Sequence, residues 1–332
     1  ENVTFAEGAT IVPNGAFVGC ADLISVTLPD TMITIGEDAF YDCISLESIN
    51  IPDSVTAING YAFYNCSSLT TITIPQNVTS LGYSNGYWYS DNGAFSMCSS
   101  LKTVTFNAYN CEIKNKEFYG CPVKTLNIGP GVKSFPKFSS VETVTFAEGA
   151  TKVPSEAFSN CARLNTVDLP DTIKRIEYNA FYNCDSLLSF EIPENVVYIG
   201  DNAFYDCDAL AEISIPETVN QVEWYAFAYC DNLSVLNFNA KNCSVNSNSF
   251  YQCPIKTLNV GAGVNKLPTI RTLETVAFAE GATKVPNNAF LSCTELTTVN
   301  LPDSIETIGN NAFKGCTGLT SITIPNSVTT ID

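Results

Sequence analysis

The sequence predicts an α/β solenoid in which short parallel strands and short helical turns follow one another along a right-handed superhelix. Two observations carry this prediction. A unit of about 23 residues recurs along the chain, and apolar residues occupy the same positions in each copy. We count about 15 coils, the first and last incomplete, and a solenoid adds length without splitting into separate cores. We therefore predict one domain over residues 1–332.

An Ala-Phe-x-x-Cys segment marks the repeat. The complete unit reads Leu-x-x-Ile-x-Ile-Pro-x-x-Val-x-x-Ile-Gly-x-x-Ala-Phe-x-x-Cys, and residues 46–66 are a representative copy. Two variants replace the alanine, before Phe118 and Phe250. The segment itself recurs at Phe17, Phe40, Phe63, Phe95, Phe158, Phe181, Phe204, Phe227, Phe290 and Phe313.

A larger unit is duplicated as well. The segment FAEGATKVP begins at Phe146 and again at Phe278, which lie 132 residues apart. Each full copy contains a shortened unit without the Phe-Cys segment, at Val123–Phe138 and Ile255–Ile270. The super-repeats span approximately residues 5–145, 146–277 and, in part, 278–332.

The first half of the unit predicts a strand. In residues 69–74, isoleucine alternates with threonine, which is the period of a strand with one buried face. Pro75 follows, and a proline ends the ladder because it has no N–H to donate. Val55 and Ile58 stand at the positions that predict a second apolar contact in their coil.

The second half of the unit predicts a turn. Ala62, Phe63 and Cys66 have the spacing of one helical turn that faces inward. Glycine before this segment allows a tight turn, with positive φ as one expectation. Such glycines are Gly36, Gly82, Gly200 and Gly309.

These residues resemble the BspA-like class of leucine-rich repeats, and the resemblance covers essentially the whole chain. It implies a leucine-rich-repeat solenoid and a secreted or surface-attached bacterial protein. Some members resemble adhesins for host matrix proteins such as fibronectin or fibrinogen. The family has no shared catalytic residues to carry over. This chain departs from the pattern at its two shortened coils and at one aromatic insertion.

Composition excludes several classes of function. The formal net charge is −18, so the chain repels nucleic acid and anionic lipid, and we expect neither as a partner. No apolar run approaches the length of a membrane span, so we expect no membrane insertion. Histidine is absent, which removes the commonest general base and metal ligand. We therefore expect no enzyme and no cofactor.

Asp206 and Asp208 could suggest calcium, but a solvated acidic turn explains them better.

The fourteen cysteines predict a buried column of reduced thiols. Twelve of them share the Cys position of the repeat. Neighbouring Cβ atoms in a parallel stack would be about 4.8 Å apart, wider than a disulfide prefers. Cys111 and Cys243 stand outside this position, and we expect them to pack as small apolar groups.

The outward strand positions predict a polar, nearly neutral face. Positions equivalent to Thr71 are serine or threonine, apart from Glu212 and Val235. This composition suits a solvated sheet, and it also suits a hydrogen-bonding surface for a protein or glycan. The next outward column includes Thr27, Asn50, Thr73, Thr105, Asn127, Thr145, Asn237, Asn259 and Asn300.

One insertion breaks the repeat, at Tyr83–Asn92, and it lengthens the first super-repeat by nine residues. Its aromatic, serine and asparagine residues are typical of recognition loops, although such rings can also fold back onto a solenoid. The chain's other tryptophan occupies the corresponding edge of the next super-repeat. The candidate ligand-binding residues are Tyr83, Tyr87, Trp88, Tyr89, Trp224 and Tyr225.

The sequence therefore favours a non-catalytic extracellular or cell-surface module for binding or adhesion. Its ligand would be a host or matrix protein or a glycan. The alternative is a passive spacer that displays another domain of a longer surface protein, since the super-repeats differ little. The chain starts and stops inside repeats, so we interpret it as a piece of something longer.

Overall fold

The computed structural model describes residues 1–83, 93–113 and 116–332. Its chain is a parallel-strand solenoid of about 14 turns, one fewer than the number we counted. It forms two compact units, Glu1–Ala150 and Thr151–Asp332. This boundary falls within a few residues of the second super-repeat's start. The expectation of one domain over the whole chain stays a prediction.

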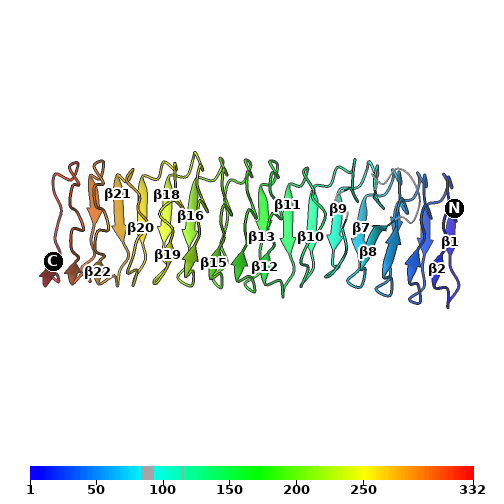
Figure 1. The fold of residues 1–332 in the computed structure, drawn as a ribbon, viewed down its shortest axis with the longest axis horizontal. Helices are drawn as coiled ribbons and strands as arrows, with labels where there is room; N and C mark the ends of the chain where they lie inside the picture. The colour runs from blue at the N-terminus through cyan, green and yellow to red at the C-terminus, as the bar shows by residue number, and fades with distance from the viewer. Residues whose placement is uncertain (84–92, 114–115) are drawn as a thin grey trace. The chain divides into compact units, whose positions relative to one another are not determined.

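In unit 1 the expected strands form parallel ladders, one strand per coil (Figure 1). Their side chains alternate between exposed and buried, as in β7, where Ile72 and Ile74 face inward. Pairing is in register, with Ile72 opposite Val104 of β9. The strands are β1 (Asn2–Thr4), β3 (Ser25–Thr27), β5 (Ser48–Ile49), β7 (Thr71–Ile74), β9 (Thr103–Phe106), β10 (Thr125–Ile128) and β11 (Thr143–Phe146).

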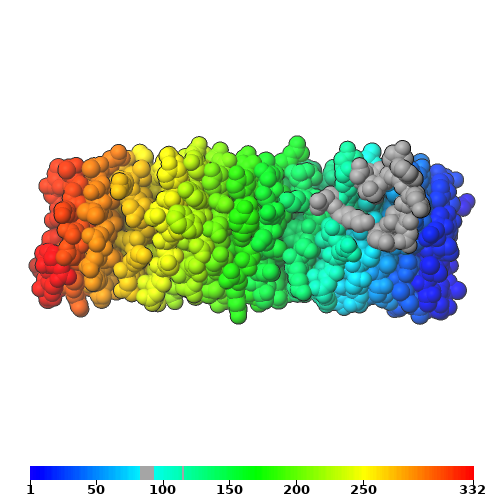
Figure 2. Space-filling model, viewed as in Figure 1, coloured from blue at the N-terminus to red at the C-terminus, as the bar shows by residue number. Residues whose placement is uncertain are grey.

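Unit 2 repeats this arrangement, and its successive coils follow one another as bands in the space-filling view (Figure 2). Ile213, Leu236 and Leu258 pair in one buried row across β16, β18 and β20. The strands are β13 (Thr166–Asp168), β16 (Glu212–Ile215), β18 (Val235–Phe238), β20 (Thr257–Val260), β21 (Thr275–Phe278) and β23 (Thr298–Asn300).

Each unit also has a second parallel ladder, which the sequence did not predict. Ile58, where the sequence predicted a second apolar contact, is a residue of β6 and pairs with Ile35. In unit 1 these strands are β2 (Ile11–Val12), β4 (Thr34–Ile35), β6 (Ala57–Asn59) and β8 (Ser80–Tyr83). In unit 2 they are β12 (Lys152–Val153), β14 (Arg175–Ile176), β15 (Tyr198–Ile199), β17 (Gln221–Val222), β19 (Ser244–Val245), β22 (Lys284–Val285), β24 (Thr307–Ile308) and β25 (Thr330–Ile331).

The shortened coil Ile255–Ile270 explains a break in this second ladder. It supplies β20 to the first ladder, but its residues, all of them described, form no strand in the second. The second ladder accordingly divides between β19 and β22. The shortened unit therefore keeps the first strand of the repeat and omits the second.

The prediction of short helical turns is wrong, because none of the described residues lies in a helix. Asp38 and Asp42 have φ of 55° and 57°, a left-handed conformation that no right-handed helix contains. Backbone donors alternate between two directions. Tyr41 N donates to Asp38 O at 3.1 Å, whereas Asp42 N donates to Tyr64 O of the next coil at 2.9 Å. The segment is thus a stack of turns bonded from coil to coil.

The glycine expectation needs a partial correction. Gly82 has a φ of 71°, as expected of a tight turn. At Gly36, however, φ is not positive, and the constraint is space. A Cβ there would lie 2.6 Å from the backbone nitrogen of Asn14 in the preceding coil. Gly36 N donates to Val12 O at 2.9 Å, so this glycine permits close approach of two coils.

The core is a column of stacked phenylalanine rings. Phe40 and Phe63 lie 5.1 Å apart, and Phe181 and Phe204 lie 5.2 Å apart. Phe63 and Phe95 flank the insertion in sequence, yet their rings stack at 4.9 Å with an angle of 2° between planes. The two coils that the insertion separates in sequence are therefore neighbours in the stack.

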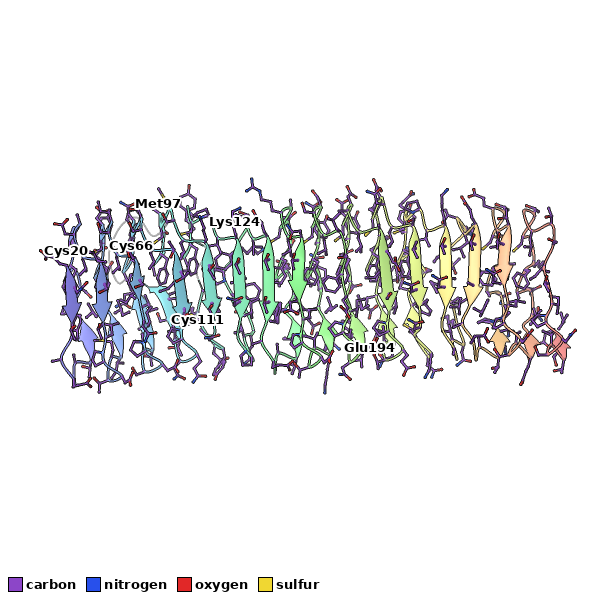
Figure 3. The ribbon with its side chains drawn as sticks, turned by 180° about the vertical axis from the view of Figure 1, so that it is seen from behind. Cys20, Cys66, Met97, Cys111, Lys124 and Glu194 are labelled. Carbon is purple, nitrogen blue, oxygen red and sulfur yellow. The ribbon has the colours of Figure 1, made fainter. Side chains whose placement is uncertain are left out.

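All fourteen cysteines, which all lie in the described ranges, are thiols, as predicted. Most are buried, and Cys20 is exposed at the first coil. Figure 3 shows Cys20 and Cys66 at the same end of their coils and Cys111 apart from them. Burial raises the pKa of Cys43 to about 12 and that of Cys243 to about 11. A thiol with so high a pKa is a poor nucleophile.

The sequence missed a second role of these thiols. Ten of the twelve column cysteines donate their S–H to a main-chain carbonyl of the preceding coil. Cys66 Sγ lies 3.3 Å from Phe40 O, and Cys207 Sγ lies 3.1 Å from Phe181 O. The thiols thus satisfy buried acceptors as well as filling space.

Candidate functional site

Trp224 and Tyr225 lie in the turn before Phe227, on the outside of unit 2. Trp224 is 49% exposed, and Tyr225 is half-buried. The backbone fixes both residues, since Trp224 N donates to Asp201 Oδ1 at 3.2 Å and Tyr225 has a φ of 54°. Their ring centroids are 6.3 Å apart. The two predicted site residues therefore form one exposed aromatic pair.

Four further tyrosines extend this pair into a larger surface. Tyr225 contacts Tyr251 with centroids 6.1 Å apart, and Tyr251 contacts Tyr229 at 5.6 Å. Tyr205 lies 5.0 Å from Tyr229 and 5.0 Å from Tyr182. We call these six residues the aromatic cluster: Tyr182, Tyr205, Trp224, Tyr225, Tyr229 and Tyr251.

The repeat itself positions these rings. Tyr182, Tyr205 and Tyr251 each follow an inward phenylalanine, so they point outward from the same turn of three coils. Tyr229 occupies a left-handed position (φ 61°) where the preceding coils have Asp206 and Asn183. Tyr229 N donates to Tyr251 O at 2.9 Å, which ties the two turns together. The cluster is therefore built on coil-to-coil hydrogen bonds.

The ring geometry decides what the aromatic cluster can contact. Tyr182 and Tyr205 stack with 7° between their planes, so each covers a face of the other. Tyr225 and Tyr251 meet edge to face at 88°. A ring face that covers another ring is not available to a sugar. The cluster accordingly offers ring edges and phenol hydroxyls, with Trp224 as its most exposed ring.

Acidic residues border these rings. Asp206 follows Tyr205 directly and has a pKa raised by burial and then by the nearby Asp208, Asp185 and Asp231. Burial and the neighbouring Asp208 raise the pKa of Asp185 in the same way. Like charges therefore gather on this side of unit 2, and an additional cation here would be stabilised.

Unit 1 carries a smaller version of this surface. Tyr41 and Tyr64 stack at 4.8 Å, and Tyr61 lies 5.9 Å from Tyr64. Here Asn65 Nδ2 donates to Asp42 Oδ1 at 2.9 Å. The outward tyrosine after the core phenylalanine is thus a shared feature of the repeat, and unit 2 enlarges it.

The remaining predicted site residues belong to the insertion. Tyr83 is the last residue of β8. Tyr87, Trp88 and Tyr89 lie outside the described residues. Their role in recognition stays a prediction.

The strand face of unit 2 carries the expected amides and is hollowed. Asn259 Nδ2 donates to Asn237 Oδ1 at 2.7 Å, and Asn237 Nδ2 donates to Ser214 Oγ at 2.9 Å. Two adjoining hollows of about 540 and 580 Å³ share Glu194 and Asn239 among their lining residues. Figure 3 labels Glu194, which lines both hollows.

One pair on this face differs between the super-repeats. Lys241 Nζ lies 2.7 Å from Glu217 Oε2 in unit 2. At the equivalent positions of unit 1, Tyr109 Oη donates to Gln76 Oε1 at 2.6 Å. The same two positions of the repeat thus form a neutral hydrogen bond in unit 1 and an ion pair in unit 2. The duplicated scaffold therefore carries different surface chemistry in its two copies.

The described residues offer no metal site, since no three of their histidine, cysteine, aspartate or glutamate side chains are grouped to hold an ion. Asp206 and Asp208 flank Cys207 in the turn beside Tyr205. Among the described residues there is also no helix that is long and apolar enough to cross a bilayer.

A stack of parallel strands built from a repeat of about 23 residues, with leucine and isoleucine at its inward positions, is typical of a leucine-rich-repeat protein. The chain matches the BspA-type leucine-rich repeat region in six copies, over residues 1–85, 89–148, 151–270 and 269–332. It therefore belongs to this family, as its repeat predicted. No curated protein matches the chain.

Several solved structures are similar to the chain. One is a leucine-rich repeat protein from Bacteroides ovatus, 26% identical over 100% of this chain and 80% of that one, with a TM-score of 0.48. Another is a leucine rich cell surface protein from Faecalibacterium prausnitzii, 24% identical over 100% and 87%, with a TM-score of 0.29. A third, from Eubacterium ventriosum, is 24% identical over 99% and 80%, with a TM-score of 0.34.

Proposed function

We propose that this chain is a non-catalytic extracellular or cell-surface binding module that acts in adhesion. Its ligand is a host or matrix protein or a glycan, and its bacterial surface location follows from what the family resemblance implies. The leucine-rich repeat supports an interaction role. One observation carries the proposal, namely the exposure of the aromatic cluster on unit 2.

The aromatic cluster favours binding over a passive spacer. Trp224 is 49% exposed, Tyr251 44% and Tyr229 37%, and the three rings lie on two adjacent coils. Large rings provide contact area at a low cost in side-chain entropy, and they commonly anchor protein interfaces. A spacer gains nothing from leaving such rings in water. The edge-to-face geometry further favours a protein ligand over a stacked sugar.

Screening the protein against an array of matrix proteins and glycans identifies the ligand for the test. Trp224→Ala combined with Tyr251→Ala should weaken binding by about tenfold or more, since each removes an anchor ring. The matched control is Tyr119→Ala, because Tyr119 is 59% exposed and lies in unit 1. Equal affinity of the double variant and the parent would place the contact surface elsewhere.

The insertion is tested separately. Removing residues 84–92 returns the spacing between Phe63 and Phe95 from 32 to 23 residues. The fold should persist, because those two rings already stack at 4.9 Å and the second super-repeat has no such insertion. If Tyr87, Trp88 and Tyr89 recognise the ligand, the deletion weakens its binding about tenfold or more. Unchanged binding would remove the insertion from the site.

A further inference from the structure

The aromatic cluster lies within a part of the chain that carries acid but no base. Residues 176–240 contain no lysine or arginine, although the chain has 16 of them. We call this range the acid-only segment. Its eleven acidic residues are Glu177, Asp185, Glu191, Glu194, Asp201, Asp206, Asp208, Glu212, Glu217, Glu223 and Asp231.

Only two of these acids have an ion pair within the described residues, and both cations come from outside the segment. Arg175 Nε lies 2.9 Å from Glu177 Oε1, and the guanidinium also covers the ring of Tyr198 at 3.8 Å. Lys241 pairs with Glu217. The other nine carboxylates have no cationic partner in the described chain, so the segment keeps a strong negative potential.

Four of those nine carboxylates follow tyrosines of the aromatic cluster within three residues along the chain, on three successive coils. Asp206 is near enough to Asp208, Asp185 and Asp231 to be repelled by each, and Asp185 is likewise repelled by Asp208. The side-chain amide of Asn183 lies beside them, and exchanging its oxygen and nitrogen would place the nitrogen 3.1 Å from Asp185 Oδ1 and 3.2 Å from Asp206 Oδ2.

At least one oxygen of these carboxylates accepts no hydrogen bond from a neutral donor. Asp208 Oδ1 is buried and has no hydrogen-bond partner among the described residues. Because this oxygen lies below the accessible surface, a cation outside acts on it through the electrostatic field and not through a direct hydrogen bond. The phenol hydroxyls and the carboxylates thus favour the same kind of ligand group, because both accept hydrogen bonds from an ammonium or guanidinium group.

We propose that the aromatic cluster and its bordering aspartates bind lysine and arginine side chains from a basic, extended segment of a partner polypeptide. This inference rests on the proposed function and specifies the chemistry of the partner. The aliphatic stems of lysine and arginine would lie along the tyrosine rings, and their charged ends would reach the carboxylates. Long-range attraction to the acid-only segment would speed the encounter.

The spacing suits a polypeptide. Successive coils are about 4.8 Å apart, so the bordering aspartates form a row rather than a point. In an extended peptide, alternate side chains lie about 6.6 Å apart on one side, and flexible lysine stems absorb the difference. A single metal ion cannot use such a row, and the described residues hold no metal group. An anionic glycan or lipid would be repelled.

The test uses a fluorescent peptide of about eight residues that alternates lysine with serine, and a matched peptide with glutamate in place of lysine. The turn-face variant is Asp185→Asn, Asp206→Asn and Asp231→Asn together. The control variant is Glu191→Gln, Glu194→Gln and Glu212→Gln, which removes the same charge from the strand face of the same segment. Anisotropy gives affinity, and circular dichroism verifies the fold of each variant.

We expect the lysine peptide to bind the parent and the glutamate peptide not to bind. The turn-face variant should lose about fivefold or more in affinity, and the control variant about twofold or less. Equal losses in both variants would overturn the inference, because bulk charge alone would then explain binding. A larger loss in the control variant would also overturn it and would move the cation site to the strand face.

The ring variants separate this inference from the proposed function. If Trp224→Ala with Tyr251→Ala weakens capture of a matrix ligand while both charge variants bind the lysine peptide alike, the aromatic surface stands and the cation inference falls. If the ring variant leaves ligand binding unchanged, the proposed surface itself fails.

Discussion

At the scale of the residue, the column cysteines combine apolar volume with a hydrogen bond. Cys207 is fully buried, and its thiol donates to Phe181 O. The sequence predicted the burial, because the position is fixed in the repeat. It could not predict the donor role, since that depends on where the preceding coil turns its carbonyl.

Comparing serine with alanine at Cys207 isolates this donor. The two side chains are similar in volume, but only serine can donate to Phe181 O. We expect Cys207→Ser to be more stable than Cys207→Ala by about 1 kcal/mol in urea unfolding. In a site without an acceptor, serine would be the less stable of the two. That opposite order would show that the thiol serves only as an apolar group.

The same scale shows why part of the candidate site was missed. Trp224 and Tyr225 were identifiable because Trp224 is the chain's other tryptophan and stands with Tyr225 at the corresponding edge of the second super-repeat. Tyr205 and Tyr251 had a signal as well, since Phe-Tyr recurs at this position in several coils. Tyr229 had none, because it stands where the preceding coils have aspartate or asparagine. Only the coil-to-coil geometry brings it against Tyr251.

At the scale of the element, one coil was predicted well in its first half and poorly in its second. The Ile-Thr-Ile alternation of β7 is long enough to reveal a strand. β4 has two residues, which is too short to show any period. The turn has the spacing of a helix, yet its left-handed residues include aspartate, asparagine, tyrosine and glutamate, so no single residue type signals them.

The phenylalanine column gives the prediction at this scale. Phe181 is fully buried and stacks on Phe204 at 5.2 Å, with Phe190 edge-on at 5.0 Å. Phe181→Ala should lower the free energy of unfolding by about 3–5 kcal/mol, because neighbouring coils share the cavity. The control is Tyr182→Ala, one residue away but on the outer face, which should cost about 1 kcal/mol. Chemical denaturation measures both, and equal costs would contradict the assigned frame.

At the scale of the whole molecule, duplication has preserved the frame and changed the surface. The 132-residue offset matches Gln76 and Tyr109 of unit 1 with Glu217 and Lys241 of unit 2 after allowance for the insertion. Eleven of the chain's 34 acidic residues fall in the acid-only segment. The net charge of −18 is therefore unevenly distributed, which a count over the whole sequence conceals. Cores tolerate little change, whereas outward positions are free to diverge.

The central claim is that the aromatic cluster of unit 2 is a contact surface, and hydroxyl-radical footprinting tests it most directly. The lysine peptide or a captured matrix ligand is bound, and oxidation of each aromatic side chain is measured with and without it. Trp224, Tyr229 and Tyr251 should be protected on binding, while Tyr109 and Tyr119 of unit 1, which are 37% and 59% exposed, should react as before. Protection of Tyr109 and Tyr119 with no change at the three rings of unit 2 would contradict the claim.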